Sequence, residues 1–162
     1  MGRFLDMIKI NIFCVGSIKE KFYKDAITEY SKRLSKFVQL NIIETHEEKI
    51  QNKSEDEVKN IEASNILKRI KDNDYLILLD LHGKEIDSLE LSNRFKNLVD
   101  KGVSPINIVI GGTLGLGSEL LKRSNERICF SKMTFPHQLM RVILLEQIYR
   151  SFKIMNNESY HH

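Results

Sequence analysis

The chain has few of the features that mark membrane proteins or disulfide-rich secreted proteins. It holds two cysteines in 162 residues, and no apolar stretch approaches the roughly 18–20 residues that span a bilayer. Cys14 and Cys129 each lie inside an apolar run, where a free cysteine behaves as a small hydrophobe, so we expect no disulfide between them. The first seven residues lack the long apolar region of a secretion signal. We therefore expect a cytoplasmic protein without a membrane partner, and no motif in the chain predicts a metal site.

No internal repeat, low-complexity tract or linker divides the sequence. Hydrophobic residues make up 41% of it and charged residues 29%, which is ordinary for a soluble globular protein. A chain of this length is one domain by the usual size range and is large enough to bury a core. Met7 stands directly before the first predicted strand. We expect residues 7–162 to form a single domain and residues 1–6 to be an upstream extension or a remnant of cloning.

The formal net charge of +3 is mild, but the charges are unevenly distributed. Residues 44–62 carry seven acids against three lysines, a local charge of −4. Residues 120–162 carry seven lysines and arginines against three acids, a local charge of +4, and residues 19–36 add a further +3. A basic C-terminal third favours a polyanionic partner such as RNA. Chance fluctuation of charge on a solvated surface explains the same pattern and stays open.

Apolar runs of strand length alternate with segments of helical periodicity. The predicted strands are 8–15, 38–44, 75–81, 106–112 and 127–130, and the predicted helices are 19–36, 54–71, 88–101 and 136–154. Ser54 and Glu57 match a capping box, Gly102 follows the third helix, and Pro136 starts the last one. This alternation predicts an α/β domain with a mostly parallel sheet and helices on both faces.

A glycine-rich turn, IGGTLGLG at 110–117, follows the fourth predicted strand. Gly112 and Gly117 have the spacing of a nucleoside-triphosphate loop, but Ser118 stands where the phosphate-binding lysine must be. The turn also departs from the dinucleotide fingerprint, which follows a first strand. Four glycines in residues 111–117 allow close backbone approach to a ligand, and the missing lysine favours an uncharged or cationic nucleoside. A purely structural turn that uses glycine for positive φ angles is the alternative.

A second polar junction, FSKMTFPHQLMR at 130–141, leads from the fifth strand into the last helix. Together with the glycine turn it predicts a nucleotide-sized pocket at the strand ends. The helix is apolar around nearly its whole circumference, which predicts burial against the sheet on one side and a second subunit on the other. Arg141 suggests an anion or substrate contact, with a structural ion pair as the alternative. Glu146 and Arg150 are spaced to pair with each other.

Four segments together resemble a known family: ILLDLHGK, IGGTLGLG, SKMTFPHQLMRVILLEQIYRSFKI and the terminal ESYHH. They resemble the small SPOUT-class methyltransferases, and within them the single-domain family that methylates N3 of a pseudouridine in 23S rRNA. The resemblance covers essentially the whole chain from Met7 to His161. It implies S-adenosylmethionine as cofactor and the SPOUT or α/β-knot fold, with a C-terminal trefoil knot. It also implies a homodimer formed through the C-terminal helix and knot, and 23S rRNA in the assembled ribosome as substrate.

The resemblance further implies roles for individual residues. Cofactor contacts fall on Leu79, Gly111, Phe130, Ser131, Lys132, Met133, Thr134 and Phe135. The substrate end of the site falls on the catalytic candidates Tyr160, His161, Arg150 and Arg141. His137 is a further catalytic candidate, because histidine titrates near neutral pH and either His137 or His161 suits removal of the N3 proton.

One departure from the family and two alternative functions accompany this prediction. The chain ends in His162, where the family usually has a lysine or arginine, which weakens one expected phosphate contact. A related SPOUT enzyme acting on another RNA, such as tRNA, is the first alternative. A non-catalytic nucleotide- or RNA-binding α/β module is the second.

Overall fold

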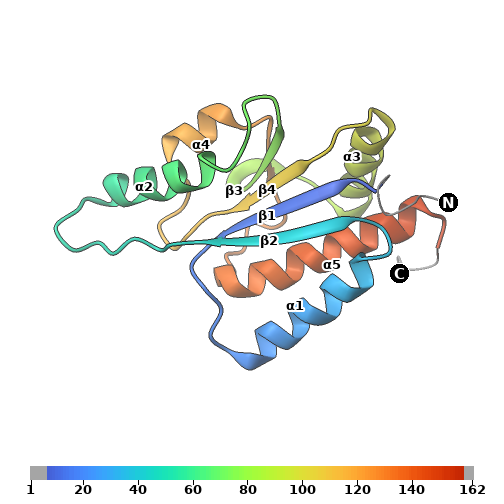
Figure 1. Ribbon diagram of the computed structural model, residues 1–162, viewed down its shortest axis with the longest axis horizontal. Helices are drawn as coiled ribbons and strands as arrows, with labels where there is room; N and C mark the ends of the chain where they lie inside the picture. Colours follow the sequence, from blue (N-terminus) through green and yellow to red (C-terminus); the bar gives the residue numbers. More distant parts are fainter. Residues whose placement is uncertain (1–6, 159–162) are drawn as a thin grey trace.

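Five strands form a sheet that has helices packed on both faces (Figure 1). The computed structural model describes residues 7–158, so Tyr160, His161 and His162 lie outside the described residues. The elements are, in chain order, β1 (Lys9–Val15), α1 (Lys21–Leu34), β2 (Gln39–Thr45), α2 (Glu55–Leu67), β3 (Tyr75–Glu85), α3 (Ser88–Asp100), β4 (Ile106–Ile110), α4 (Ser118–Arg123), β5 (Glu126–Cys129) and α5 (His137–Met155).

Every neighbouring pair of strands in the sheet is parallel, in the order β2-β1-β4-β3-β5. The predicted parallel sheet with helices on both faces is therefore confirmed. In a parallel sheet the loops that follow the strands leave from one edge, the carboxyl edge, which is where such folds bind ligands. The glycine turn after β4 and the loop between β5 and α5 both begin at this edge.

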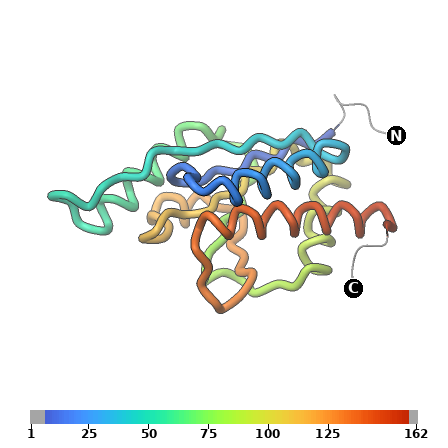
Figure 2. Tube along the Cα trace, turned by 90° about the horizontal axis from the view of Figure 1, so that it is seen from below, coloured from blue at the N-terminus to red at the C-terminus, as the bar shows by residue number. Residues whose placement is uncertain are grey.

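The alternation of side chains along the buried strands divides the core into two layers. On β1, Ile10, Ile12 and Cys14 point into the larger layer, which is covered by α1, α3 and α5. Phe13 and Val15 point into the smaller layer, under α2 and α4. Helices α1 and α5 run side by side in the same direction below the larger layer (Figure 2). Both cysteines are buried and free, as expected from their apolar surroundings.

A ladder of side-chain amides crosses the sheet. Asn41 of β2 donates to Asn11 of β1 at 3.1 Å, and Asn11 donates to Asn107 of β4 at 3.1 Å. Asn107 in turn donates to the Tyr75 carbonyl oxygen of β3 at 3.1 Å. A one-residue slip of β1, β2 or β4 would send its amide to the opposite face, so the ladder favours the observed register of these three strands.

Most predicted boundaries agree with the structure, and the differences have local causes. Ser54 caps α2 by accepting from the Glu57 N–H, and Asp87 with Glu90 forms a complete capping box on α3. The predicted turn after residue 81 is wrong, because β3 continues to Glu85 and pairs again with β5. Helix α4 was not predicted. Its six residues are too few to show a helical period.

We expect Asn107→Leu to lower the free energy of unfolding by about 1–3 kcal/mol, because it removes two amide contacts and leaves Asn11 and the Tyr75 carbonyl without them. Urea unfolding of the purified protein measures this loss. Asn97→Leu, at an exposed position on α3, is the control and should change stability by less than about 0.5 kcal/mol. A loss no larger than the control's would show that the ladder contributes no stability.

Candidate cofactor and active site

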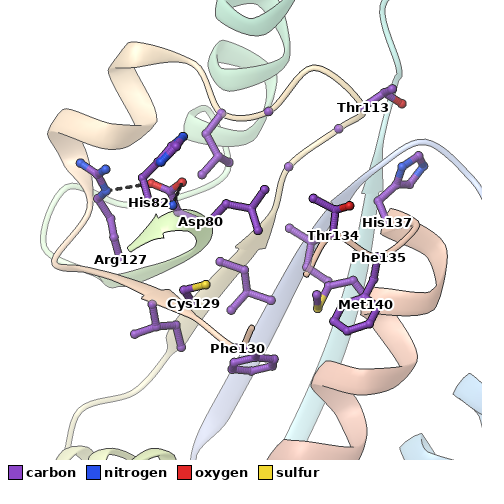
Figure 3. A pocket seen from close by; sticks show the side chains of 18 of the residues that line it. Asp80, His82, Thr113, Arg127, Cys129, Phe130, Thr134, Phe135, His137 and Met140 are labelled. Atoms are coloured by element: carbon purple, nitrogen blue, oxygen red, sulfur yellow. Dashed lines mark hydrogen bonds and ion pairs between the residues drawn. The ribbon is translucent and has the colours of Figure 1, made fainter. Parts of the chain in front are cut away.

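A cavity of about 660 Å³ lies at the carboxyl edge of the sheet (Figure 3). Its walls come from the ends of β3 and β4, the glycine turn, β5 with the loop that follows it, and the first turn of α5. Its volume is in the usual range for small-molecule sites. Segments from four places in the sequence meet here because all the strands that carry them end at this edge.

The glycine turn is shaped by close backbone contacts. Gly115 has a φ of +101° and its N–H donates to the Gly112 carbonyl at 3.0 Å, which closes the turn. A Cβ on Gly117 would lie 2.6 Å from the Lys59 carbonyl oxygen of α2, so no side chain fits there. The shape of the turn therefore requires glycine at positions 115 and 117. The turn also lines the cavity from Gly111 to Leu116, so its backbone faces a ligand as well.

The loop between β5 and α5 forms the opposite wall. The Cys129 thiol donates to the Ser131 carbonyl at 3.0 Å, and the Ser131 hydroxyl accepts from the Met133 N–H at 3.0 Å. The helix after the loop begins at His137, with Pro136 at its N-cap and no side-chain cap, so Thr134 is not the cap. Its side chain lines the cavity instead.

The structure brings together most of the residues predicted to hold the cofactor. Seven of the eight line the cavity: Leu79, Gly111, Phe130, Ser131, Met133, Thr134 and Phe135. Lys132 does not; it lines an adjacent cavity of about 510 Å³ together with Glu85 and Asp87. His137, predicted as a catalytic candidate, also lines the main cavity.

Arg141 lies outside the lining of the cavity and is buried, with 3% of its side chain exposed. Its guanidinium forms an ion pair with Glu44 at 2.6 Å and donates to the carbonyl oxygens of Val15 at 3.1 Å and Gly16 at 2.7 Å. These contacts hold the start of α5 against the ends of β1 and β2. The geometry therefore corresponds to the structural ion pair, the alternative to a substrate contact.

Arg150 is far from the cavity within one chain. It pairs with Glu146 at 3.2 Å, as the i,i+4 spacing predicted. Thirteen residues of continuous helix separate it from His137, which corresponds to about 20 Å at 1.5 Å per residue. The described part of a single chain therefore does not bring Arg150 to the cavity, and Tyr160 and His161 lie outside the described residues.

Comparisons with known proteins show the family of the chain. The chain matches a family model described as "Predicted SPOUT methyltransferase" over residues 8–161. Three similar proteins, from Clostridium tetani (strain Massachusetts / E88), Clostridium novyi (strain NT) and Clostridium botulinum (strain 657 / Type Ba4), are named ribosomal RNA large subunit methyltransferase H. Each is 54% identical over 158 residues, which cover 95% of this chain and 99% of the relative. The chain belongs to the SPOUT methyltransferase family.

Residues 7–158 of this SPOUT methyltransferase offer no site for a metal ion of the usual kind, because they hold no group of three or more His, Cys, Asp or Glu side chains placed to bind one. Within the same residues, no helix is both long enough and apolar enough to cross a membrane.

The cavity also contains charged residues that the sequence analysis did not assign. Asp80, His82 and Arg127 form one side of it, and Lys59 of α2 reaches it from beyond the glycine turn. Asp80 and His82 lie in the segment ILLDLHGK, so both could have been predicted from that motif. Arg127 could not be found in this way, because its place beside Asp80 depends on the pairing of β5 with β3.

A buried carboxylate of α2 lies against the glycine turn. Glu62 of α2 is 5% exposed, accepts from the Glu48 N–H at 3.1 Å, and would lie 2.9 Å from a Cβ on Gly112. Burial, with a smaller contribution from nearby acids such as Glu47, raises the pKa of the Glu62 carboxyl above its ordinary 4.5. The folded state therefore disfavours the ionised form.

This raised pKa predicts a pH dependence of stability. Ionisation of Glu62 costs folding free energy once the pH rises above 4.5, whereas at lower pH the carboxyl is protonated in both states and the cost vanishes. We expect Glu62→Gln, whose amide oxygen still accepts from Glu48, to be more stable than wild type near neutral pH. The difference should shrink as the pH falls, in urea unfolding at a series of pH values. Glu55→Gln, exposed on the same helix, is the control. A variant less stable than wild type near neutral pH would contradict the prediction.

Proposed function

We propose that this SPOUT methyltransferase uses S-adenosylmethionine to methylate N3 of a pseudouridine in 23S rRNA of the assembled ribosome. The observation that carries the proposal is the cavity at the carboxyl edge, which gathers seven of the eight residues that the family resemblance assigns to the cofactor. The relatives named ribosomal RNA large subunit methyltransferase H, 54% identical over nearly their full length, support the substrate class. Residues 7–162 would act as one cytoplasmic domain.

The lining of the cavity fits S-adenosylmethionine better than a nucleotide with phosphates. Its walls are mostly backbone and apolar side chains, as an adenosine ring system requires. Both of its strong cations are already paired with acids, Lys59 with Asp56 at 3.4 Å and Arg127 with Asp80 at 2.9 Å. Little uncompensated positive charge is left for a polyphosphate. S-adenosylmethionine carries a sulfonium cation and no phosphate, so it does not need uncompensated positive charge in the cavity.

When bound, S-adenosylmethionine supplies a methyl group that is already activated toward a nucleophile. The chain's own task is to hold the reacting partners in line and to help remove the N3 proton. His137 lies in the wall of the cavity at the start of α5, and its imidazole is the described group best placed to accept that proton. The tail histidine His161, outside the described residues, is the second candidate.

We also propose that two copies of the chain form a homodimer through α5. Leu139, Val142 and Ile143 are only half-buried and follow one face of the helix, away from the residues that pack into the core. Glu146 and Arg150 continue the same face at helical spacing. A second copy that covers this face would bury the apolar positions and bring its own Arg150 and tail toward the cofactor pocket of the first.

A trefoil knot in the C-terminal part is a further element of the proposal. The chain leaves β5 at the edge of the sheet, forms the loop beside the glycine turn, and then returns as α5 under β1 and β4 to contact α1 and α3. Passage of the last segment through the loop that follows β3 or β4 would give the family's knot. It would also hold the cofactor-binding loop firmly, because the loop could not be displaced without moving α5.

The basic first helix is a candidate for contacts with the RNA backbone. Of its cations, Lys21 pairs with Asp25 and Arg33 pairs with Glu29 while it lies over the Tyr30 ring. Lys19, just before the helix, and Lys24 and Lys32 within it are exposed and remain for phosphate contacts. Selection of a single nucleotide would then rest on the shape of the ribosome as well as on base contacts.

We expect Thr134→Lys to weaken S-adenosylmethionine binding by tenfold or more, because it adds a cation to the lining of a cavity that would hold a cationic ligand. Thr28→Lys on the exposed face of α1 should bind like wild type. Titration calorimetry measures the affinities. Methylation of ribosomes and of tRNA, followed by mass spectrometry of the pseudouridine, tests the substrate. Wild-type protein that binds no S-adenosylmethionine would overturn the enzyme proposal, and methylation of tRNA alone would overturn the substrate.

A test by mixing variants addresses the dimer. Thr134→Lys and Arg150→Ala proteins should each be inactive alone, whereas a refolded mixture should regain part of the activity, because one site of each mixed dimer has both residues intact.

Ile143→Glu should be monomeric in sedimentation experiments, and Ile50→Glu, at a position 54% exposed on the β2–α2 loop, should sediment like wild type. A wild-type monomer, or a mixture without recovered activity, would contradict the shared site.

A further inference from the structure

An ion pair forms the polar side of the cofactor cavity. The Asp80 carboxylate accepts from Arg127 Nε at 2.9 Å through Oδ2 and from the His82 N–H at 3.0 Å through Oδ1. The Asp80 side chain is 11% exposed and that of Arg127 39%. Figure 3 shows this pair on one side of the cavity, with Thr134, Phe135 and His137 on the other.

The local backbone departs from regular strand pairing to place this pair. Leu79 and Lys84 both register with Ile128 of β5, so the four residues 80–83 have no counterpart on the neighbouring strand. A Cβ on Gly83 would lie 2.7 Å from the Arg127 carbonyl carbon, which shows how closely the extra segment crosses β5. Irregularities of this kind often re-aim a side chain next to an active site. Here the irregularity begins at Asp80.

Both members of the pair retain capacity for further hydrogen bonds. Each carboxylate oxygen of Asp80 accepts one bond from the described residues and can accept another. Arg127 uses only Nε, and its terminal Nη1 and Nη2 have no hydrogen-bond partner among the described residues. In the lining of the cavity, a negatively charged hydrogen-bond acceptor, Asp80, therefore lies beside a positively charged hydrogen-bond donor, Arg127.

We propose that Asp80 and Arg127 bind the amino-acid head group of the cofactor, with the α-ammonium on Asp80 and the α-carboxylate on the terminal nitrogens of Arg127. The inference rests on the proposed use of S-adenosylmethionine and goes beyond it by assigning the end of the molecule that carries these charges. A ligand group with both signs on one carbon satisfies both residues at once. A ribose diol would occupy Asp80 and leave the guanidinium without a new partner, and a phosphate would be repelled by the carboxylate.

This assignment orients the whole ligand. With the head group at Asp80 and Arg127, the nucleoside lies among the Leu79 end of β3, the glycine turn and the loop after β5. Arg127 pairs with Asp80 through Nε alone, so the pair holds the guanidinium in the lining of the cavity and leaves its two terminal nitrogens for a further hydrogen-bond partner.

Two ligands that differ only in the head group test the proposal. S-adenosylhomocysteine carries it, and 5′-methylthioadenosine lacks it but keeps the adenine, the ribose and the sulfur. We expect Asp80→Asn and Arg127→Gln each to weaken S-adenosylhomocysteine binding about tenfold in titration calorimetry, the size expected for loss of a charged hydrogen bond. Both variants should bind 5′-methylthioadenosine like wild type, which also shows that they are folded.

Asp100→Asn and Lys96→Gln, which break an exposed ion pair on α3, are the matched controls and should leave both affinities unchanged. Equal weakening of the two ligands by Asp80→Asn or Arg127→Gln would overturn the assignment, because it would place the ribose there or give the pair a purely structural role. Unchanged binding of S-adenosylhomocysteine would overturn it as well. Wild-type protein that binds neither ligand would instead refute the proposed cofactor, an outcome distinct from these two.

Discussion

The amide ladder from Asn41 through Asn11 and Asn107 to the Tyr75 carbonyl connects four of the five strands, and the arrangement of the site depends on it. Strands buried on both faces carry apolar residues in nearly every position, so their hydrophobic pattern alone specifies register poorly. Side-chain amides that pair across neighbouring strands reduce this ambiguity. With the register set, the strand ends align, and the segments that follow β3, β4 and β5 converge on one cavity.

A second polar contact, made by the buried Arg141, joins the carboxyl edge of the sheet to the last helix. Arg141 reaches Glu44 at the end of β2 and the carbonyl oxygens at the end of β1, while His137, one turn earlier on α5, lines the cavity. The position of His137 relative to the sheet is thus determined by Arg141. The Arg141 side chain is buried, whereas that of Glu44 is 43% exposed. Removing Glu44 is therefore costly, because it leaves a buried guanidinium without its charge partner. The nearby Cys14 thiol, whose pKa burial raises to about 11, stays protonated and adds no reactive group to this region.

The sequence was sufficient for the fold class because every element except the short α4 carries its own signal. Strand-length apolar runs, Ser54 at a helix start and Gly102 at a helix end are local features, and each was found in the expected place. The irregular end of β3 was missed, because its pairing with β5 joins residues far apart in the sequence. The same reason explains which residues of the site could be predicted. The glycine turn and the loop after β5 were recognised from local motifs, whereas the ion pair of Asp80 with Arg127 forms only when β3 and β5 pair. Arg141 is the converse case, since an arginine in an apolar helix has the same sequence pattern whether it binds a substrate or a distant glutamate, and the structure shows its ion pair with Glu44.

The length of α5 has a consequence for how an enzyme this small can work. The cavity at the carboxyl edge is built from residues that lie between Lys59 and Met140, and the start of α5 is its last wall. Arg150 lies about 20 Å farther along a continuous helix, and a helix does not bend back on itself to shorten that distance. If Arg150 and the tail act on the substrate, as the family resemblance implies, a second copy must supply them to the cavity of the first. The half-buried face with Leu139, Val142 and Ile143 runs from the cavity toward Arg150. Contact through that face would therefore stabilise the dimer and complete the active site in the same step, so activity should depend on protein concentration in the way that dimer formation does.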